Sequence, residues 1–193
     1  PWSVIIFCLL LVALAASGIR LITFTTNYRV FFSDNNPQLL AFEALENTYV
    51  KNDNVLFVLA PESGNVFTRE VLSVVEELTS KAWQTPYSNR VDSITNFQHT
   101  EAEEDDLIVR DLVTNAESLS DEELEKIKNI GINEPLLIHR LISESGHVTG
   151  INVTVQMPGI NEASETPEVV NFSRNLANEI RAAHPELNVY ITG

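Results

Sequence analysis

The first nineteen residues are almost wholly apolar, and the pattern changes at Arg20. A run of this length is close to the ~20 residues that a helix needs to cross a bilayer. Trp2 before the run, and Arg20 and Tyr28 after it, are residue types typical of membrane interfaces. We therefore expect a transmembrane helix within residues 1–22. The competing interpretation is a secretory signal peptide, because residues 13–15 have the small-x-small form of a cleavage site, but the run is longer than an ordinary apolar region of ~7–15 residues and no charge precedes it.

A membrane-proximal segment with a short helix is expected over residues 23–53. The stretch that leaves the apolar run is rich in β-branched and aromatic residues up to Phe32. Pro37, preceded by two asparagines, suits the first turn of a helix. The helix should cover residues 37–50, since apolar residues recur there at helical spacing: Leu39, Phe42, Leu45 and Tyr49.

The remainder, residues 54–193, is expected to form one α+β domain, and its first part is a β–α–β unit. A continuous apolar run at 55–60 predicts a strand buried on both faces. A helix should follow and end before Pro86, with one apolar stripe made of Phe67, Val71, Val74, Leu78 and Ala82. A second strand is expected at 91–97.

A second β–α–β unit is predicted at residues 148–192. Apolar and polar residues alternate within 148–157, as in a half-buried strand. A helix opens at Thr166-Pro167 and ends at Pro185, with a stripe made of Val169, Phe172, Leu176, Ile180 and Ala183. A last strand occupies 187–192. Two such units are similar to the split β-α-β of ferredoxin-like domains, so we expect one shared antiparallel sheet with both helices on one face.

The segment at 98–147 is inserted between the two units. The acidic run at 101–106 is expected to be a solvated loop that leads into a short apolar stretch at 107–113. Ser120 and Glu123 have the spacing of a capping box, which predicts a helix from 121 to about 130, ended by Gly131. A strand is expected at 136–143, separated from the next one by a turn.

Charge and cysteine content exclude several classes of protein. The chain has 27 acidic and 12 basic residues, a formal net charge of −15. Such a surface repels phosphates, so nucleic acid is not an expected partner. The single cysteine, Cys8, lies inside the apolar run, which excludes an intramolecular disulfide.

No motif in the sequence indicates catalysis, a metal or a cofactor. The four histidines (His99, His139, His147 and His184) share no metal-ligand spacing. The acidic run lacks the glycine and the alternating ligands of a calcium loop. The Ser-Gly pairs at 63–64 and 145–146 lack the pattern of a nucleophile elbow, and no glycine-rich phosphate loop is present. We therefore expect a protein that is not an enzyme and has no catalytic residue, no metal and no cofactor.

The order of these pieces resembles a known family. The apolar helix is followed by Asn27 to Pro37, by Asn54 to Val58, by Leu119 to Leu124, and by Leu141 to Gly146 leading into Thr149 to Val155. This succession is similar to the N-terminal part of an exporter of the resistance–nodulation–division (RND) superfamily, in the branch related to MMPL and Patched proteins. Because the chain opens on Pro1 and not on Met, we also expect it to be part of a longer protein.

The resemblance implies a function and a location. Such exporters consist of two repeats, each with a large extracytoplasmic porter domain after its first membrane helix, and they move hydrophobic or amphiphilic molecules at the expense of the proton gradient. Their proton-relay residues lie on a later helix. The implied location is the inner (plasma) membrane, with the domain on the extracytoplasmic or periplasmic side. The implied partners are the lipid bilayer, a hydrophobic or amphiphilic small molecule or lipid, and the rest of the transporter chain. The alternative is a membrane-tethered or secreted binding or adaptor domain without transport activity.

Within this interpretation, four membrane-proximal aromatic residues are candidates for a substrate path: Phe24, Tyr28, Phe31 and Phe32. A lipid-like molecule leaving the bilayer would meet them first, and the inserted segment 98–147 is the second candidate. The alternative is that the aromatic residues only seat the domain at the membrane interface.

Overall fold

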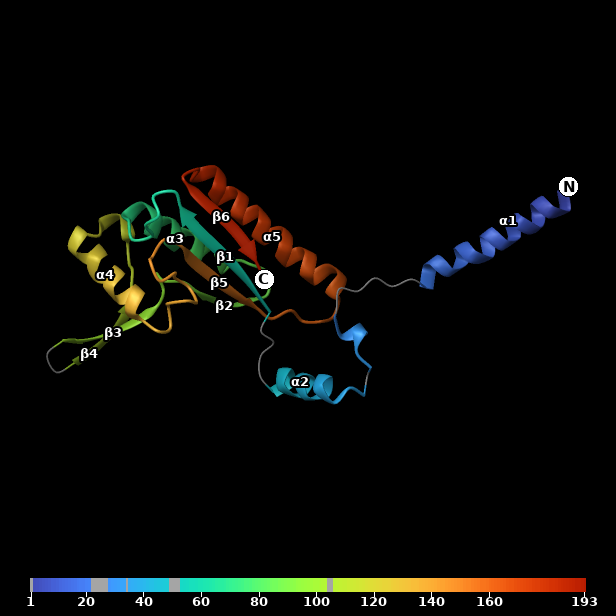
Figure 1. Ribbon diagram of the computed structural model, residues 1–193, viewed down its shortest axis with the longest axis horizontal. Helices are drawn as coiled ribbons and strands as arrows, with labels where there is room; N and C mark the ends of the chain where they lie inside the picture. The colour runs from blue at the N-terminus through green and yellow to red at the C-terminus, as the bar shows by residue number, and fades with distance from the viewer. Residues whose placement is uncertain (1, 22–27, 34, 49–52, 104–105) are drawn as a thin grey trace. The chain divides into compact units, whose positions relative to one another are not determined.

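The computed structural model describes residues 2–21, 28–33, 35–48, 53–103 and 106–193 (Figure 1). The chain divides into two compact units, one ending at Thr48 and the other beginning at Tyr49.

The N-terminal run is helical, as expected. Helix α1 (Trp2–Ser17) continues into a 3₁₀ turn, η1 (Gly18–Leu21), and α1 has no buried residue. In the described part of the chain, this is the one helix that is long and apolar enough to cross a membrane. Twenty helical residues span about 30 Å, which matches the hydrocarbon thickness of a bilayer. This length and composition suit a membrane anchor, and a signal sequence meets the same test.

The expected short helix is α2 (Pro37–Thr48), preceded by a 3₁₀ turn, η2 (Tyr28–Phe31). The side chain of Asn36 caps α2, because its Oδ1 accepts hydrogen bonds from the backbone N–H groups of Gln38 and Leu39 at 2.9 and 3.1 Å. Pro37 occupies the first turn, as expected. Of the predicted stripe, Leu39 is buried and Leu45 is 55% exposed, whereas Tyr49 lies outside the described residues.

The second unit is built on one four-stranded antiparallel sheet. Its strands are β1 (Asp53–Pro61), β2 (Ser88–Asp92), β5 (Thr149–Val155) and β6 (Leu187–Thr192). Their order in the sheet is β2-β5-β1-β6, and every neighbouring pair is antiparallel. Helix α3 (Arg69–Ala82) connects β1 to β2, and α5 (Glu162–Ala183) connects β5 to β6. The prediction that the two β–α–β units share one antiparallel sheet is confirmed.

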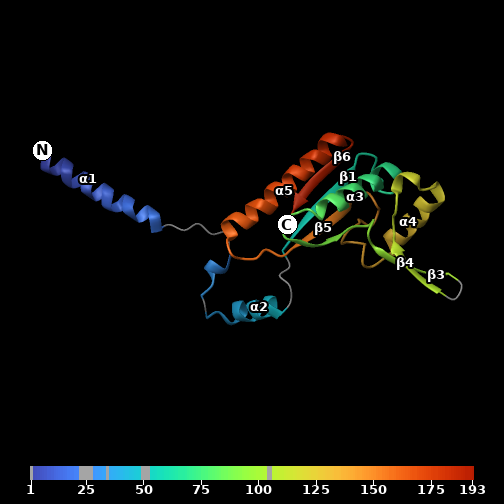
Figure 2. The ribbon, with the colours of Figure 1, turned by 180° about the vertical axis from the view of Figure 1, so that it is seen from behind.

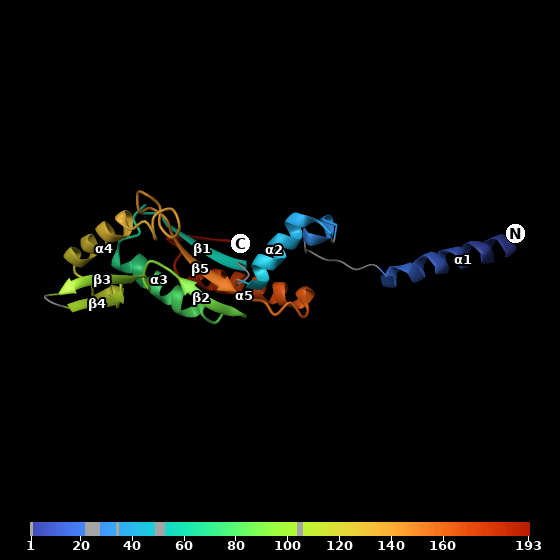
Figure 3. The ribbon, with the colours of Figure 1, turned by 90° about the horizontal axis from the view of Figure 1, so that it is seen from below.

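Both connecting helices pack on the same face of the sheet, below the strands in Figure 3. Alternate residues of β1 point toward them, and Phe57 and Leu59 have no exposed surface. The helices contribute a matching apolar layer that includes Leu72, Leu78 and Ile180. Removing this apolar surface from water is the main stabilising contribution to the unit.

Two expected boundaries around α3 are wrong. Phe67 precedes the helix, which begins after Thr68, whose hydroxyl accepts a hydrogen bond from the N–H of Val71. The strand expected at 91–97 lies instead at 88–92, because the polar turn that follows ends it. In that turn the Asn96 side chain accepts a hydrogen bond from the backbone N–H of Ser93 at 2.8 Å and donates one to the Val91 carbonyl.

Helix α5 begins earlier than the Thr166-Pro167 boundary suggested, at Glu162. The buried carboxylate of Glu165 accepts hydrogen bonds from the backbone N–H groups of three residues just before and at the helix start, Gly159, Ile160 and Asn161, each at 2.9 Å. These bonds hold the first turn ahead of Pro167, which therefore lies inside the helix. The predicted stripe is buried at Val169, Leu176 and Ile180, but Ala183 is exposed, so its assignment to the core is wrong.

The inserted segment differs most from the expectation. Its acidic run at 101–106 is not a solvated loop where it is described, because β3 (Gln98–Glu103) and β4 (Asp106–Asp111) pair antiparallel as a hairpin, with Glu101 opposite Ile108. Residues 104–105 lie outside the described residues. Figures 1 and 2 show this hairpin projecting from the end of the domain that carries α4, away from the C-terminus. The segment predicted as a strand at 136–143 forms successive turns, with only isolated bridges at Ile138 and Ile142.

Helix α4 (Asp121–Asn133) confirms the capping box of Ser120 and Glu123 but not the predicted end. Gly131 lies inside the helix because the ring of Phe67 packs against it. A Cβ atom at Gly131 would be 3.2 Å from Phe67 Cζ, and one at Gly146 would be 2.7 Å from Phe67 Cε2. The two glycines therefore serve close packing around one aromatic ring.

The inserted segment is held on α3 by charged side chains that bind backbone groups. The Glu76 carboxylate accepts hydrogen bonds from the N–H groups of Asn115 and Ala116 at 2.8 and 2.7 Å, at the start of the 3₁₀ turn η3 (Ala116–Ser118). Arg69 donates to the carbonyl of Leu119 and pairs with Asp121. These contacts make the insertion part of the second unit.

Candidate functional site

The face of the sheet opposite α3 and α5 is the open face. On β1 it presents Leu56, Val58 and Ala60, which are half-buried, whereas the intervening residues are buried under the helices. The prediction that this strand is buried on both faces is therefore wrong. Tyr190, next to Val58 on β6, is 58% exposed on the open face.

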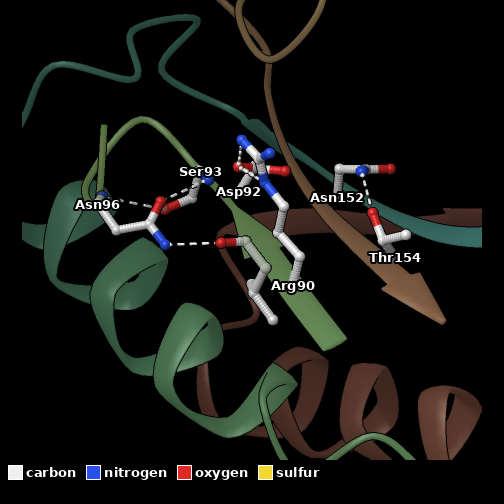
Figure 4. Close-up of polar contacts among 7 residues, drawn as sticks. Arg90, Asp92, Ser93, Asn96, Asn152 and Thr154 are labelled. Atoms are coloured by element: carbon white, nitrogen blue, oxygen red, sulfur yellow. Dashed lines mark hydrogen bonds and ion pairs between the residues drawn. The ribbon is translucent and has the colours of Figure 1, made fainter. Parts of the chain in front are cut away.

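Polar side chains gather on the part of the open face formed by β2 and β5. The strand register aligns Arg90 with Thr154 and Asp92 with Asn152 (Figure 4). The guanidinium of Arg90 donates through Nε to Asp92 Oδ1 at 2.8 Å, and its Nη2 lies 2.8 Å from the same oxygen. On the neighbouring strand β1, the Asn54 amide donates to Asn152 Oδ1 at 2.7 Å. We call these residues, Asn54, Arg90, Asp92, Asn152 and Thr154, the polar ledge.

The loop at 134–148, here called the crossing loop, joins α4 to β5 and runs over the open face on the side opposite the two helices (Figure 3). The Leu141 carbonyl accepts hydrogen bonds from the N–H of Gly150 at 2.7 Å and from the Thr149 hydroxyl at 2.9 Å. A Cβ atom at Gly150 would lie 3.1 Å from Leu56 Cδ1 and 3.9 Å from Leu141 Cα. Glycine at this position thus lets the loop lie close to the sheet.

A groove of about 440 Å³ lies between the crossing loop and the polar ledge. Its polar side is formed by ledge residues and by the turn at 93–96. Its apolar side is formed by Leu56, Phe97 and three leucines of the crossing loop at 136, 137 and 141. Arg140 of the same loop also lines it. This size and this mixture of polar and apolar walls are typical of small-molecule sites.

A larger hollow of about 800 Å³ lies between α5 and the adjoining ends of β1, β5 and β6. Arg174 and Arg181 line it, together with apolar residues that include Met157 and Val169. Arg181 donates both Nε and Nη2 to the Val189 carbonyl, so its position is fixed by the edge strand.

The aromatic residues predicted for a substrate path lie in the first unit or outside the described part. Phe24 and the side chain of Tyr28 are not among the described positions. Phe31 is 86% exposed and Phe32 is 47% exposed. Phe32 lines a hollow of about 320 Å³ beside the ion pair of Arg29 and Glu43, in which Nε and Oε1 are 3.7 Å apart. Their part in a path stays a prediction.

A serine–histidine cluster at 143–147 has the wrong geometry for a nucleophile. The hydroxyls of Ser143 and Ser145 lie 3.0 and 2.5 Å from the same nitrogen, His147 Nδ1. A catalytic base needs its second nitrogen oriented by another group, and no described residue bonds His147 Nε2. Ser143 Oγ also accepts from the backbone N–H groups of His147 and Val148, which marks the cluster as a turn.

Glu101 is a carboxylate with a strongly lowered pKa. Hydrogen bonds from Lys126 and then from Arg110 lower its pKa to about 2. Lys126 Nζ is 2.6 Å from Glu101 Oε1, Arg110 pairs with the other oxygen, and His99 Nε2 is 3.6 Å away. Because Lys126 belongs to α4, this network ties the β3–β4 hairpin to that helix. Its function is structural, and among the described residues no three histidine, cysteine or acidic side chains are grouped as metal ligands.

In comparisons with known proteins, no protein-family model matches the chain, and no curated protein matches it.

The groove was not apparent from the sequence because its parts come from four separate segments. The alternation that includes Asn152 and Thr154 correctly indicated a half-buried strand. It did not indicate that the crossing loop lies over the polar side of this strand. Arg140 belongs to the segment at 136–143, which was expected to be a strand, so the crossing loop was not predicted. A run of five leucine or isoleucine residues at 136–142, interrupted by His139-Arg140, was the available signal.

Proposed function

We propose that this chain is the first membrane helix and the first extracytoplasmic domain of an RND-type exporter, related to the MMPL and Patched branch, that moves hydrophobic or amphiphilic molecules. The observation that carries the proposal is the combination of a bilayer-length apolar helix with a domain whose sheet is closed on one face and open on the other. The family resemblance of the sequence motifs points the same way.

The strand order supports the finer fold assignment. The succession β1-α3-β2-β5-α5-β6 with sheet order β2-β5-β1-β6 is the topology of a split β-α-β, ferredoxin-like domain. We infer that the unit is a porter-type domain with residues 93–148 inserted between its two halves. Fold alone does not assign a function, so transport needs its own test.

The membrane assignment makes a prediction about location. We infer that α1 is retained as an anchor in the inner (plasma) membrane and that the second unit lies on the extracytoplasmic or periplasmic side. Cys8 is the single cysteine of this sequence, so C8A combined with N175C, in a full-length protein whose other cysteines are also replaced, places one thiol on an exposed position of α5. A membrane-impermeant maleimide should label this variant in intact cells. Labelling only after lysis would contradict the orientation, and a soluble protein with a new N-terminus near Ala16 would show a cleaved signal peptide.

Transport is tested with the whole gene in cells. Expression of the full-length protein should lower the accumulation of Nile Red, a hydrophobic dye, and a protonophore should abolish the difference. Equal dye accumulation with and without the protein, at confirmed expression, would fail to support export of this class of molecule. F31A and F32A are tested in the same assay. Unchanged export at unchanged abundance would remove these two aromatic residues from the path.

The alternative is a tethered or secreted binding domain, which the open face of the sheet would also suit. The two functions differ in the rest of the gene, because a transporter needs further membrane helices and a second helix-plus-domain repeat. A gene that encodes neither would favour the binding domain.

A further inference from the structure

We propose that the groove between the crossing loop and the polar ledge binds one amphiphile with an anionic headgroup, a carboxylate or a phosphate. The proposal deepens the proposed function, since it names the class of molecule that the extracytoplasmic domain receives.

The charge of the groove is opposite to that of the chain. Its lining includes the guanidinium groups of Arg90 and Arg140 and one carboxylate, Asp92, so its net charge is +1, whereas the whole chain carries −15. In a protein with 27 acidic residues a positive lining is uncommon, and the hollow by α5, with Arg174, Arg181 and Asp53, shares it. A cleft of one charge sign concentrates ligands of the opposite sign.

Arg140 has donors to offer a ligand. Within the part of the chain that the structure describes, its guanidinium forms no ion pair or hydrogen bond, whereas Arg69, Lys81, Arg90 and Lys126 all pair with acidic side chains. The backbone of Arg140 is held in the crossing loop by a hydrogen bond from its N–H to the Leu137 carbonyl at 3.1 Å. A planar guanidinium fixed at its base in this way suits bidentate recognition of a carboxylate or phosphate.

Arg90 is positioned but not saturated. Its Nε and Nη2 both contact one oxygen of Asp92, Oδ1, and Figure 4 shows the guanidinium standing on the ledge beside that carboxylate. The Nη1 group has no partner among the described residues. On the adjacent strand, Asn152 Oδ1 accepts from Asn54, and its Nδ2 donates to Thr154 Oγ1 at 3.5 Å, which leaves the second N–H of this amide for a ligand. The ledge therefore presents oriented donors to the same groove that Arg140 lines.

The opposite wall supplies the apolar half of the site. Leu56 lies at its base, and Leu136, which is 57% exposed, and Leu141 extend it along the crossing loop. A volume near 440 Å³ accommodates a single chain of medium length with its headgroup. A purely polar anion would leave this wall in contact with water, and a neutral lipid would leave the guanidinium groups without a partner.

The test uses the full-length protein in nanodiscs of phosphatidylcholine, which has no net charge. The probe is a dodecanoic acid that carries a photoreactive diazirine, and the crosslinked peptides are identified by mass spectrometry. We expect label on the crossing loop and on β2. Dodecanoate and dodecyl phosphate should both compete, which shows that the headgroup is read as an anion, whereas dodecanol and dodecyltrimethylammonium should not.

The matched variants are R140Q and R174Q. Loss of a charge-assisted hydrogen bond should lower labelling about tenfold in R140Q. R174Q removes another arginine that has no ion pair among the described residues but lines the hollow by α5, so it should label normally. Equal melting temperatures of both variants and of the unaltered protein establish that the fold is intact.

The proposal is overturned if dodecanol competes as well as dodecanoate, if R140Q labels normally, or if the label maps to the hollow by α5 and is lost in R174Q. These outcomes are independent of export. Labelling of the groove in a protein that exports nothing would contradict the proposed transport function and leave the site standing.

Discussion

The two faces of the central sheet follow different rules. On the covered face, Phe57 and Leu59 of β1 meet the apolar stripes of α3 and α5 and lose all contact with solvent. On the open face, the alternate residues of β1 are half-buried. There β2 presents arginine and aspartate side chains, and β5 presents asparagine. Substitutions at two successive positions of β1 should therefore change stability by different amounts, because successive side chains of a strand point to opposite faces.

The sequence predicts the two faces unequally well. The covered face is formed by apolar side chains packed together, and the apolar pattern of the sequence predicts these residues well. The open face depends on which distant segments cross it. Here the crossing loop, some 80 residues further along the chain than β1, forms one wall of the groove.

The largest expected effect compares neighbours on β1. F57A should destabilise the second unit by about 3–5 kcal/mol, because it leaves a cavity in a closed core. L56A, on the open face, should cost less, about 1–2 kcal/mol, because Leu56 is only partly buried in the folded protein. Pulse proteolysis of the purified protein across a urea series measures both. Equal losses would mean that the two faces are equally buried in the folded protein.

An intermediate effect concerns how the crossing loop is held. G146A should destabilise by roughly 2–4 kcal/mol, since the new Cβ would lie 2.7 Å from the Phe67 ring at a backbone φ of +67°. Gly64 has the same φ, and nothing lies within 4 Å of its Cβ position, so G64A should cost only about 1 kcal/mol. The difference between the urea midpoints of the two variants measures the contribution of the clash with the Phe67 ring. If G64A matched G146A, backbone conformation alone would account for the loss.

The smallest effect is electrostatic and depends on pH. The folded pKa of Glu101 is lowered to about 2 from an ordinary 4.5, chiefly by Lys126. A carboxylate with a lowered pKa stabilises the fold above its unfolded pKa and loses this contribution as pH falls toward its folded pKa. Attachment of the β3–β4 hairpin to α4 should therefore be constant above about pH 5 and weaken between pH 5 and pH 2.

Hydrogen exchange of the hairpin amides, compared with E101Q at each pH, measures this change and cancels the intrinsic exchange rate. The difference between the two proteins should shrink as pH falls. A difference that stays constant down to pH 2 would mean that Glu101 does not hold the hairpin through its charge.

Much of the fold was predictable because its core elements have strong periodic patterns. The strands at β1, β5 and β6, the helix stripes with Val71 and Leu78, and the Ser120–Glu123 capping box all follow from local spacing. Errors arose where a distant contact decided the outcome. Gly131 looked like a helix end but makes room for Phe67, and Pro167 looked like a helix start although Glu165 already holds the turn before it.

The groove was not predictable in the same way. Asn54, Arg90, Arg140 and Asn152 are polar residues in ordinary positions, and only the sheet order brings them around one space. The predicted path residues Phe31 and Phe32 remain separate candidates, because they belong to the first unit.

The central claim is that the open face serves transport and the covered face serves stability. It is tested most directly by measuring dye export per molecule of full-length protein in cells for R140Q and for V153A, a truncation in the buried core. We expect R140Q to lower export severalfold at unchanged abundance, whereas V153A should lower abundance and export in proportion. Normal export by R140Q, together with a loss of export per molecule in V153A, would contradict it.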